Sequence, residues 1–168
     1  MSSPPLKRPA ILAVLMFILG ILAWELYLRS DGVNRSYDDG DPLWAHHRGR
    51  VYMPADQATV FIGSSRIKFD LDTDTWEDIT GEKPVQLACV GSTPLPVLYD
   101  LADDPDFRGK LIIDVTEGLF FSKNPGNFFR PNGGLKYYKE ITPAQRAGFI
   151  LNKPLESTFV FLDKEDLS

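Results

Sequence analysis

The longest run of apolar positions lies near the N-terminus, where Ile11–Trp24 contains no charged residue. Extended to Pro9–Leu28, the segment has 20 residues and Glu25 is its one charged position. At a rise of about 1.5 Å per residue, a helix of this length spans about 30 Å, the thickness of the hydrocarbon core of a bilayer. Trp24 and Tyr27 stand where aromatic side chains often meet the membrane surface. The pattern predicts a transmembrane helix over residues 9–28.

Two other interpretations of this segment remain open. A cleaved signal peptide has a shorter apolar core and small residues at the cleavage site. Here the bulky residues Trp24, Glu25, Leu26 and Tyr27 follow the core, which disfavours cleavage. A helix buried in a soluble domain is the third interpretation. The uncleaved anchor agrees best with the length and flanks of the segment.

The orientation of the predicted anchor follows from its flanking cations. Lys7 and Arg8 precede the segment, while Arg29 and Arg35 follow it. Basic residues near a membrane-spanning helix favour the cytoplasmic side. With the short tail 1–8 kept inside, we expect a single-pass protein of the inner (cytoplasmic) membrane whose C-terminal portion is periplasmic or extracellular.

The pattern changes after a polar juxtamembrane linker at residues 29–56, which includes one or two helical turns at Pro42–Gly49. Short apolar, β-rich runs then alternate with helical patterns. Strands are predicted at Ala58–Ile62, Val85–Val90 and Lys110–Val115, and helices at Asp72–Ile79, Leu95–Ala102 and Thr142–Lys153, the last continuing to Leu162. Asn124–Gly134, with its prolines and glycines, is predicted to be a loop. Alternating strands and helices indicate an α/β domain with a parallel sheet over residues 57–168.

Charge and cysteine content narrow the function classes. The chain has 18 basic and 23 acidic residues and a net charge of −5. Without Lys7, Arg8 and Glu25 these become 16 and 22, so the part outside the anchor has a net charge of −6. An acidic domain argues against nucleic acid as a partner. Cys89 is the single cysteine, so no intrachain disulfide forms.

The sequence offers no strong metal or cofactor signal. His46 and His47 are adjacent and therefore point apart in a helix or a strand, which disfavours a two-histidine metal site. The run Asp70–Asp74 has the acidic spacing of a calcium loop, but it lacks the glycine and glutamate that complete one. A nucleotide-binding domain is a weaker alternative, because neither a P-loop nor a dinucleotide fingerprint occurs. We expect neither a metal nor a cofactor.

The segments that directly follow the predicted strands are the candidate site. In an open parallel sheet, ligands bind outside the carboxyl ends of the strands. These segments are Gly63–Arg66, Gly91–Thr93 and Thr116–Gly118. They combine glycines, hydroxyl side chains and one arginine.

The first of these segments resembles a known family motif. The stretch VFIGSSRIKFD is similar to the first block of the SGNH (GDSL-like) hydrolase superfamily, with Ser64 in place of the usual aspartate and Ser65 at the nucleophile position. Its Gly-Ser-Ser-Arg form looks like that of a membrane-anchored bacterial branch, and Gly91 in LACVGST matches the glycine of the second block. The resemblance covers about Ala58–Phe121. It implies a flavodoxin-like fold and an esterase or acyltransferase acting on envelope glycans or lipids.

The resemblance implies a role for each site residue. Ser65 is the expected nucleophile. The backbone N–H groups of Ser65 and Gly91 are expected to form the oxyanion hole. Arg66, Ser64 and Ser92 are expected to contact the substrate. Each has a structural alternative. Ser64 and Ser65 would cap the following helix, and Gly91 would permit a tight turn. Arg66 would form an ion pair with Asp70 or Glu117.

The catalytic base of the family has no match in this chain. The family takes its histidine from an Asp-x-x-His motif near the C-terminus, and here no histidine follows His47. The family's third block also brings an asparagine, whereas Asn124 and Asn127 stand out of register. We favour a chain that is the N-terminal part of a longer protein, because the third strand would otherwise have an uncovered edge. The alternative is a shortened, non-catalytic relative that acts as a binding module in the envelope.

Overall fold

The computed structural model describes residues 7–33, 39–54 and 57–162. The chain forms two compact units. The first, which we call the sheet unit, runs from Asp39 to Thr142. The second, the helical unit, joins the segment up to Asp38 with the segment from Pro143 onward. Each unit is described by itself.

The sheet unit contains the parallel sheet that the sequence predicts. Its strands are β1 (Thr59–Ile62), β2 (Val85–Gln86) and β3 (Lys110–Ile113), in the order β2-β1-β3. Val60 pairs with Val85 on one side and with Leu111 on the other. The α/β class is thereby confirmed. The second strand is shorter than predicted, although the Leu87 N–H still donates to the Phe61 carbonyl at 2.8 Å.

Seven helices of the sheet unit lie in its described part. They are α2 (Asp41–Arg48), α3 (Ser65–Asp70), α4 (Thr73–Thr80), α5 (Leu95–Ala102), α6 (Glu117–Phe120), the 3-10 helix η1 (Pro125–Phe128) and α7 (Phe129–Glu140). The helices expected at α2, α4 and α5 are confirmed. In α4 the Asp72 carboxylate accepts hydrogen bonds from the N–H groups of Asp74 and Thr75, and Gly81 ends the helix at φ 74°. Both signals are local, which is why the sequence reveals them.

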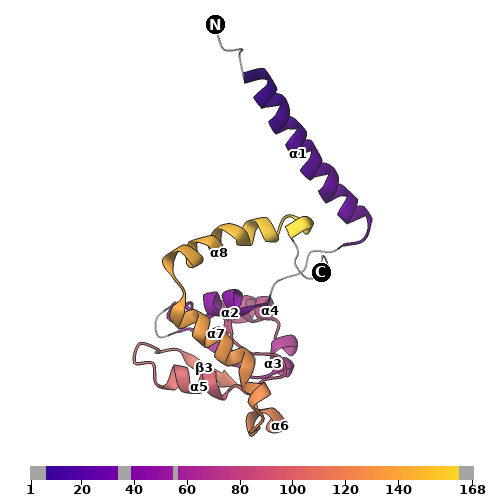
Figure 1. Ribbon diagram of the computed structural model, residues 1–168. Helices are drawn as coiled ribbons and strands as arrows, with labels where there is room; N and C mark the ends of the chain where they lie inside the picture. Colours follow the sequence, from indigo (N-terminus) through magenta and orange to yellow (C-terminus); the bar gives the residue numbers. More distant parts are fainter. Residues whose placement is uncertain (1–6, 34–38, 55–56, 163–168) are drawn as a thin grey trace. The chain divides into compact units, whose positions relative to one another are not determined.

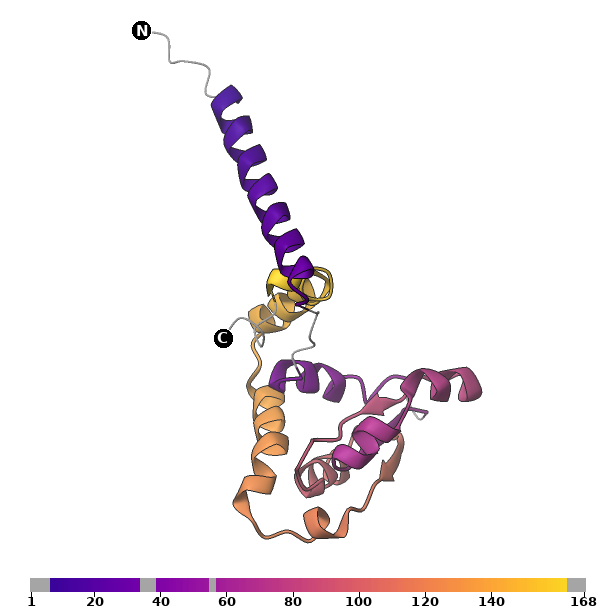
Figure 2. The same ribbon diagram turned by 90° about the vertical axis from the view of Figure 1, so that its right-hand side faces the viewer.

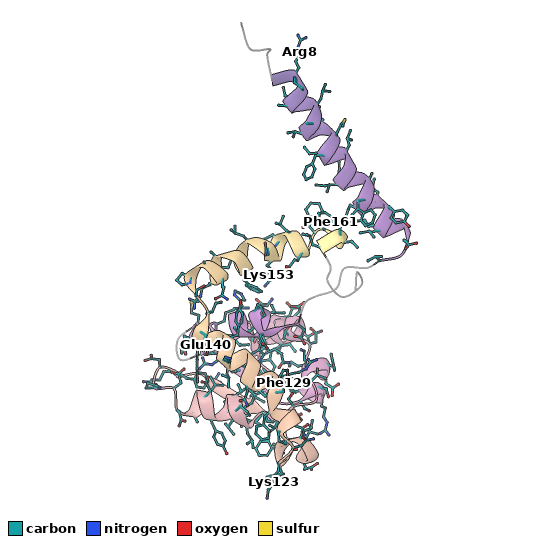
Figure 3. The ribbon with its side chains drawn as sticks, viewed as in Figure 1. Arg8, Lys123, Phe129, Glu140, Lys153 and Phe161 are labelled. Atoms are coloured by element: carbon teal, nitrogen blue, oxygen red, sulfur yellow. The ribbon has the colours of Figure 1, made fainter. Side chains whose placement is uncertain are left out.

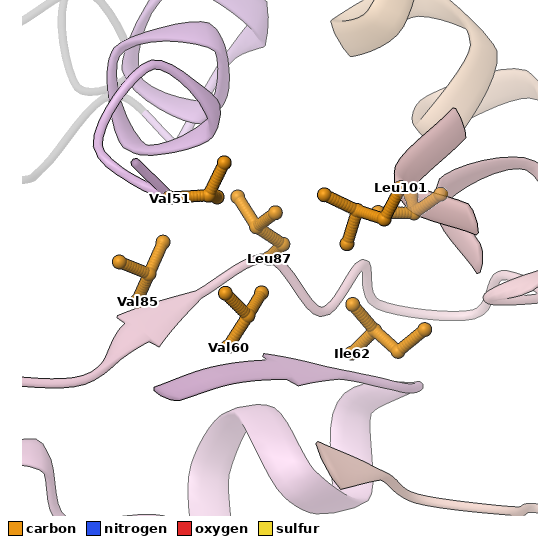
Figure 4. Packing of buried hydrophobic residues seen from close by; sticks show 7 residues of the cluster. Val51, Val60, Ile62, Val85, Leu87 and Leu101 are labelled. Atoms are coloured by element: carbon orange, nitrogen blue, oxygen red, sulfur yellow. The ribbon is translucent and has the colours of Figure 1, made fainter. Parts of the chain in front are cut away.

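The core forms on both faces of the central strand. Val60 and Ile62 point to one face, where they join Val51, Val85, Leu87, Val97 and Leu101 (Figure 4). On the other face, the ring of Phe61 meets that of Trp76 edge to face at a centroid distance of 5.0 Å. Because both faces are covered, β1 is apolar at nearly every position rather than at alternate ones.

The loop expected at Asn124–Gly134 is wrong, because most of this segment is helical. The 3-10 helix η1 leads directly into α7, which packs against α2 (Figure 1). Leu135 is buried in this contact, and a Cβ on Gly134 would stand 2.6 Å from the ring of Trp44. The glycine that signals a loop locally therefore permits close helix packing. Burial offsets the low helix propensity of the segment.

Helix α2 belongs to the sheet unit, whereas the sequence predicts a linker over residues 29–56. The indole N–H of Trp44 donates to the Leu87 carbonyl at 3.1 Å. The side chain of Arg48 is only 2% exposed and forms ion pairs with Asp100 and Asp104, both at 2.8 Å. These contacts attach α2 to the segment after β2 and to the end of α5.

The helical unit contains α1 (Lys7–Ser30), α8 (Pro143–Glu156) and the 3-10 helix η2 (Val160–Leu162). Within the described part of the chain, Arg8–Ser30 is the one helix that is long and apolar enough to cross a membrane. Its apolar side chains are exposed along most of its length (Figure 3). The expected helix at 142–153 is confirmed as α8, but its continuation to Leu162 is interrupted before η2.

Candidate functional site

The carboxyl ends of the three strands meet around Gly63. The Cys89 N–H donates to the Gly63 carbonyl at 3.2 Å, and the Asp114 N–H donates to the Ile62 carbonyl at 2.9 Å. These bonds join the segments after β2 and β3 to the turn after β1. The strand-end segments predicted from the sequence therefore lie at one edge of the sheet.

Gly63 makes the turn from β1 into α3 sterically feasible. A Cβ at this position would stand 2.6 Å from Cγ2 of Ile67 and 2.8 Å from Cβ of Asp114. Real Cβ atoms do not approach other carbons this closely, so a larger residue would push α3 and the end of β3 apart. The glycine holds the two serines that follow it close to β3.

Ser64 is a structural partner of β3 in this arrangement. Its side chain is buried, and its Oγ lies 2.7 Å from Oγ1 of Thr116, which in turn donates to Oδ2 of Asp114 at 3.2 Å. Ser64 occupies the N-cap position of α3 but makes no side-chain capping bond. The expected side-chain cap is therefore absent, and the hydroxyl contacts Thr116 instead.

Ser65 is the first residue of α3 and is half-buried. A residue at this position has a backbone N–H with no acceptor within the helix. Among the described residues, its hydroxyl has no hydrogen-bond partner, so no base is hydrogen-bonded to it. The nucleophile position thus offers a hydroxyl and an N–H at the sheet edge without an activating group.

Arg66 points away from the core and is available to a ligand. Its side chain is 58% exposed, and Nη1 lies 3.9 Å from Oδ1 of Asp114. The sequence predicts an ion pair of Arg66 with Asp70 or Glu117. An ion pair is present, but its acidic partner is Asp114. An exposed pair at this distance is weak, because water screens both charges.

The segment after β2 forms a second wall of this edge. Gly91 is exposed and has a φ of 64°, a conformation that glycine adopts without strain. Ser92 is buried, and its hydroxyl donates to the Val90 carbonyl at 3.1 Å. The Thr93 N–H donates to the Asn127 carbonyl at 2.9 Å, so η1 lies beside this segment.

Sequence reasoning missed Asp114 as a site residue. It was assigned to the third strand, yet its carboxylate lies close to both Thr116 and Arg66. A carboxylate directly after an apolar run of a parallel strand is the signal that would have identified it. The two histidines lie in α2 instead, with ring centroids 5.7 Å apart. In the described parts of the chain, no group of three or more His, Cys, Asp or Glu side chains could hold a metal ion.

Cys89 lies at this edge but is not a reactive thiol. Its side chain is buried, and burial raises the pKa of the thiol to about 11. At pH 8 only about one thiol in a thousand would be ionised, and the thiolate is the reactive form.

We therefore expect the native full-length chain to resist a disulfide exchange reagent at pH 8 and to release one thiol after unfolding in urea. A matched variant, Val115→Cys, places a thiol at a position that is exposed beyond the end of β3. It should react at once in the native state. Immediate reaction of the unmodified protein would show that Cys89 is accessible.

In comparisons with known proteins, no family model, no curated protein and no solved structure matches the chain. Its function must be inferred from its own residues and their geometry.

Proposed function

We propose that α1 remains in a bilayer as an anchor and holds the sheet unit outside the cytoplasm. The length of α1 and its exposed apolar side chains support this proposal. Lys7 and Arg8 at its start favour a cytoplasmic N-terminus. The sheet unit then works in the periplasm or outside the cell, next to the lipids and glycans of the envelope.

The proposed activity is acyl transfer from an ester, with Ser65 as the nucleophile. The observation that carries it is the position of Ser65, directly after the turn at the carboxyl edge of β1 and partly open to solvent. The strand order β2-β1-β3 corresponds to the first three strands of a flavodoxin-like sheet, in which ligands bind at this edge. The resemblance of the Gly-Ser-Ser-Arg segment to the SGNH hydrolases agrees with this assignment.

The chemistry follows from these groups. The Ser65 Oγ would attack the ester carbonyl carbon, the bond to the alcohol oxygen would break, and the alcohol would leave with the serine's proton. Water or a second hydroxyl would then take the acyl group from the serine. The N–H groups of Ser65 and Gly91 would stabilise the oxyanion. The exposed guanidinium of Arg66 would favour an ester that carries an anionic group.

A specific observation favours a second candidate, a non-catalytic binding module. A serine hydroxyl is a weak nucleophile until an adjacent base accepts its proton. Among the described residues, no base is hydrogen-bonded to the Ser65 hydroxyl. In this second function the same edge would bind an envelope ester or glycan through Arg66 and the exposed backbone at Gly91 without cleaving it.

One experiment separates the two functions. If the protein is an acyl-transfer enzyme, a fluorophosphonate probe should label the full-length protein in membranes, because the probe reacts only with an activated serine. Ser65→Ala should abolish labelling completely. Ser92→Ala removes a buried serine at the same edge and should keep it. If the unaltered protein is folded and takes up no probe, catalysis is rejected and binding remains as the proposed function.

A further inference from the structure

Helix α8 exposes an apolar face that no described residue of the helical unit covers. At 3.6 residues per turn, six of its residues fall on one side of the helix. They are Ala144, Ala147, Ile150, Leu151, Pro154 and Leu155, and all are exposed. The three largest, Ile150, Leu151 and Leu155, are 55%, 70% and 47% exposed. This is an unbroken stripe, not a set of scattered surface positions.

The rest of α8 is polar and carries two cations. Gln145, Asn152 and Glu156 lie on the side opposite the apolar stripe, while Arg146 and Lys153 lie near one border of it. Phe149 is the exception on the polar side, and it is half-buried. A helix with an aliphatic face, a polar face and flanking cations is typical of helices that lie in the interface of a membrane.

The C-terminal end of α8 is linked to the apolar helix α1 by a buried carboxylate. Glu25 accepts hydrogen bonds from the N–H groups of Val160 and Phe161, at 3.0 and 3.1 Å. Arg29 donates to the Thr158 carbonyl at 2.8 Å. These bonds hold η2 against the carboxyl-terminal turns of α1, and both views show η2 beside that end of α1 (Figures 1 and 2).

The link sets the depth of α8 relative to the bilayer. Only residues 157–159 separate α8 from η2. Glu25 lies five residues before the end of α1, where a membrane-spanning helix leaves the hydrocarbon core. The start of α8 follows Thr142, the last residue of the sheet unit. With α1 spanning a bilayer, the C-terminal end of the exposed apolar stripe would be tethered near the level where lipid headgroups meet acyl chains.

We infer that α8 lies in the surface of the same bilayer that holds α1, with Ile150, Leu151 and Leu155 among the acyl chains. This inference rests on the proposed anchoring by α1. Lipid is the occupant that the tether brings to the stripe, and Arg146 and Lys153 can reach the headgroup phosphates from its border. The sheet unit would then be attached to the membrane at both of its ends, through α1 and through α8. A site restrained in this way suits an ester at the membrane surface.

Site-directed spin labelling of the full-length chain in vesicles of phosphatidylcholine and phosphatidylglycerol tests this inference. Nitroxides placed by Leu151→Cys and Asn152→Cys compare the two faces of α8 at neighbouring positions, both exposed. A third label, placed by Leu15→Cys, reports on α1. The wild-type protein, whose Cys89 is buried, is the blank; if it labels, the series is repeated with Cys89→Ala.

The label at position 151 should lie about 5–10 Å below the headgroups and relax faster with oxygen than with a water-soluble nickel chelate. The label at 152 should show the reverse. Three results would overturn the inference. They are access of the nickel chelate to the label at 151, shielding of that label from both reagents, and spin–spin broadening that depends on protein density. If the label at position 15 relaxes faster with oxygen than with the nickel chelate, α1 is in the bilayer, and a negative result at position 151 concerns α8 alone. If position 15 also meets the nickel chelate, the anchor fails and the inference fails with it.

Discussion

Replacing Arg48 with methionine should lower the free energy of unfolding of the sheet unit by about 3–5 kcal/mol. The guanidinium donates from Nε to Asp100 at 2.9 Å, from Nη2 to Asp104 at 2.8 Å and from Nη1 to the hydroxyl of Tyr52 at 2.9 Å. It also lies 5.0 Å from the ring centroid of Tyr138. Methionine preserves much of the apolar bulk, but it leaves Asp104 without a cation and Asp100 with only the exposed Lys139.

A control variant at Lys139 shows whether the loss of unfolding free energy requires a buried cation or follows from removing any positive charge near Asp100. Lys139 forms an ion pair with the other oxygen of Asp100 at 2.7 Å, but its side chain is 63% exposed. Lys139→Met should therefore cost less than about 1 kcal/mol. Urea unfolding of the full-length proteins in detergent, followed by tryptophan fluorescence, measures both values. Equal effects of the two variants would contradict the assigned role of Arg48.

The pH dependence of the unfolding free energy checks the same network. Hydrogen bonds from Tyr52 and Arg48 outweigh burial and lower the pKa of Asp104 to about 2. A carboxyl group with a depressed folded-state pKa stabilises the fold above its unfolded pKa of about 4. That stabilisation is lost as the pH falls from about 4 towards 2. In Arg48→Met the folded-state pKa of Asp104 should rise towards its unfolded value, so the loss of unfolding free energy between about pH 4 and 2 should become smaller.

The second large effect is expected for Gly109→Ala, which should lower the free energy of unfolding by about 3 kcal/mol. A Cβ at this position would stand 2.2 Å from the carbonyl oxygen of Ala58 and 2.9 Å from the ring of Phe107. That carbonyl accepts the Lys110 N–H at 2.8 Å, the bond at the start of the β1–β3 pairing. Because the obstacle is backbone, the clash is relieved only by moving β3 away from β1.

Gly118→Ala is the control for this substitution. A Cβ on Gly118 meets no atom within 4 Å, and its backbone lies outside the left-handed region. The change should be close to neutral or slightly stabilising, because alanine restricts the unfolded chain more than glycine does. The urea measurement described for Arg48 applies to both glycine variants. An alanine at position 109 that leaves unfolding unchanged would show that β3 accommodates the added methyl group.

Several elements could be predicted because their causes are local. The apolar run of α1 needs no neighbour to explain it. The boundaries of α4 follow from Asp72 before it and Gly81 after it, and β1 is recognisable because both its faces are buried. For the same reason the candidate site could be placed at the strand ends before its partners were known.

Other features depend on residues that are distant in sequence. Thr116 lies beside Ser64, and Asp114 beside Arg66, because β3 pairs with β1. No spacing within the chain specifies that pairing. The α7 segment carries glycines that favour a loop, and only packing against the Trp44 ring makes them suited to a helix.

By itself, the sequence determined the apolar helix near the N-terminus, the α/β class and the location of the candidate serine. Periodicity, caps and breakers act within a few residues, so they are visible without a fold. The tertiary structure alone decided that α7 is a helix, that Asp114 and not Asp70 or Glu117 lies beside Arg66, and that Glu25 binds the N–H groups of Val160 and Phe161. Those outcomes depend on which distant groups are buried together, because a buried charge or N–H group must find a partner wherever the chain brings one.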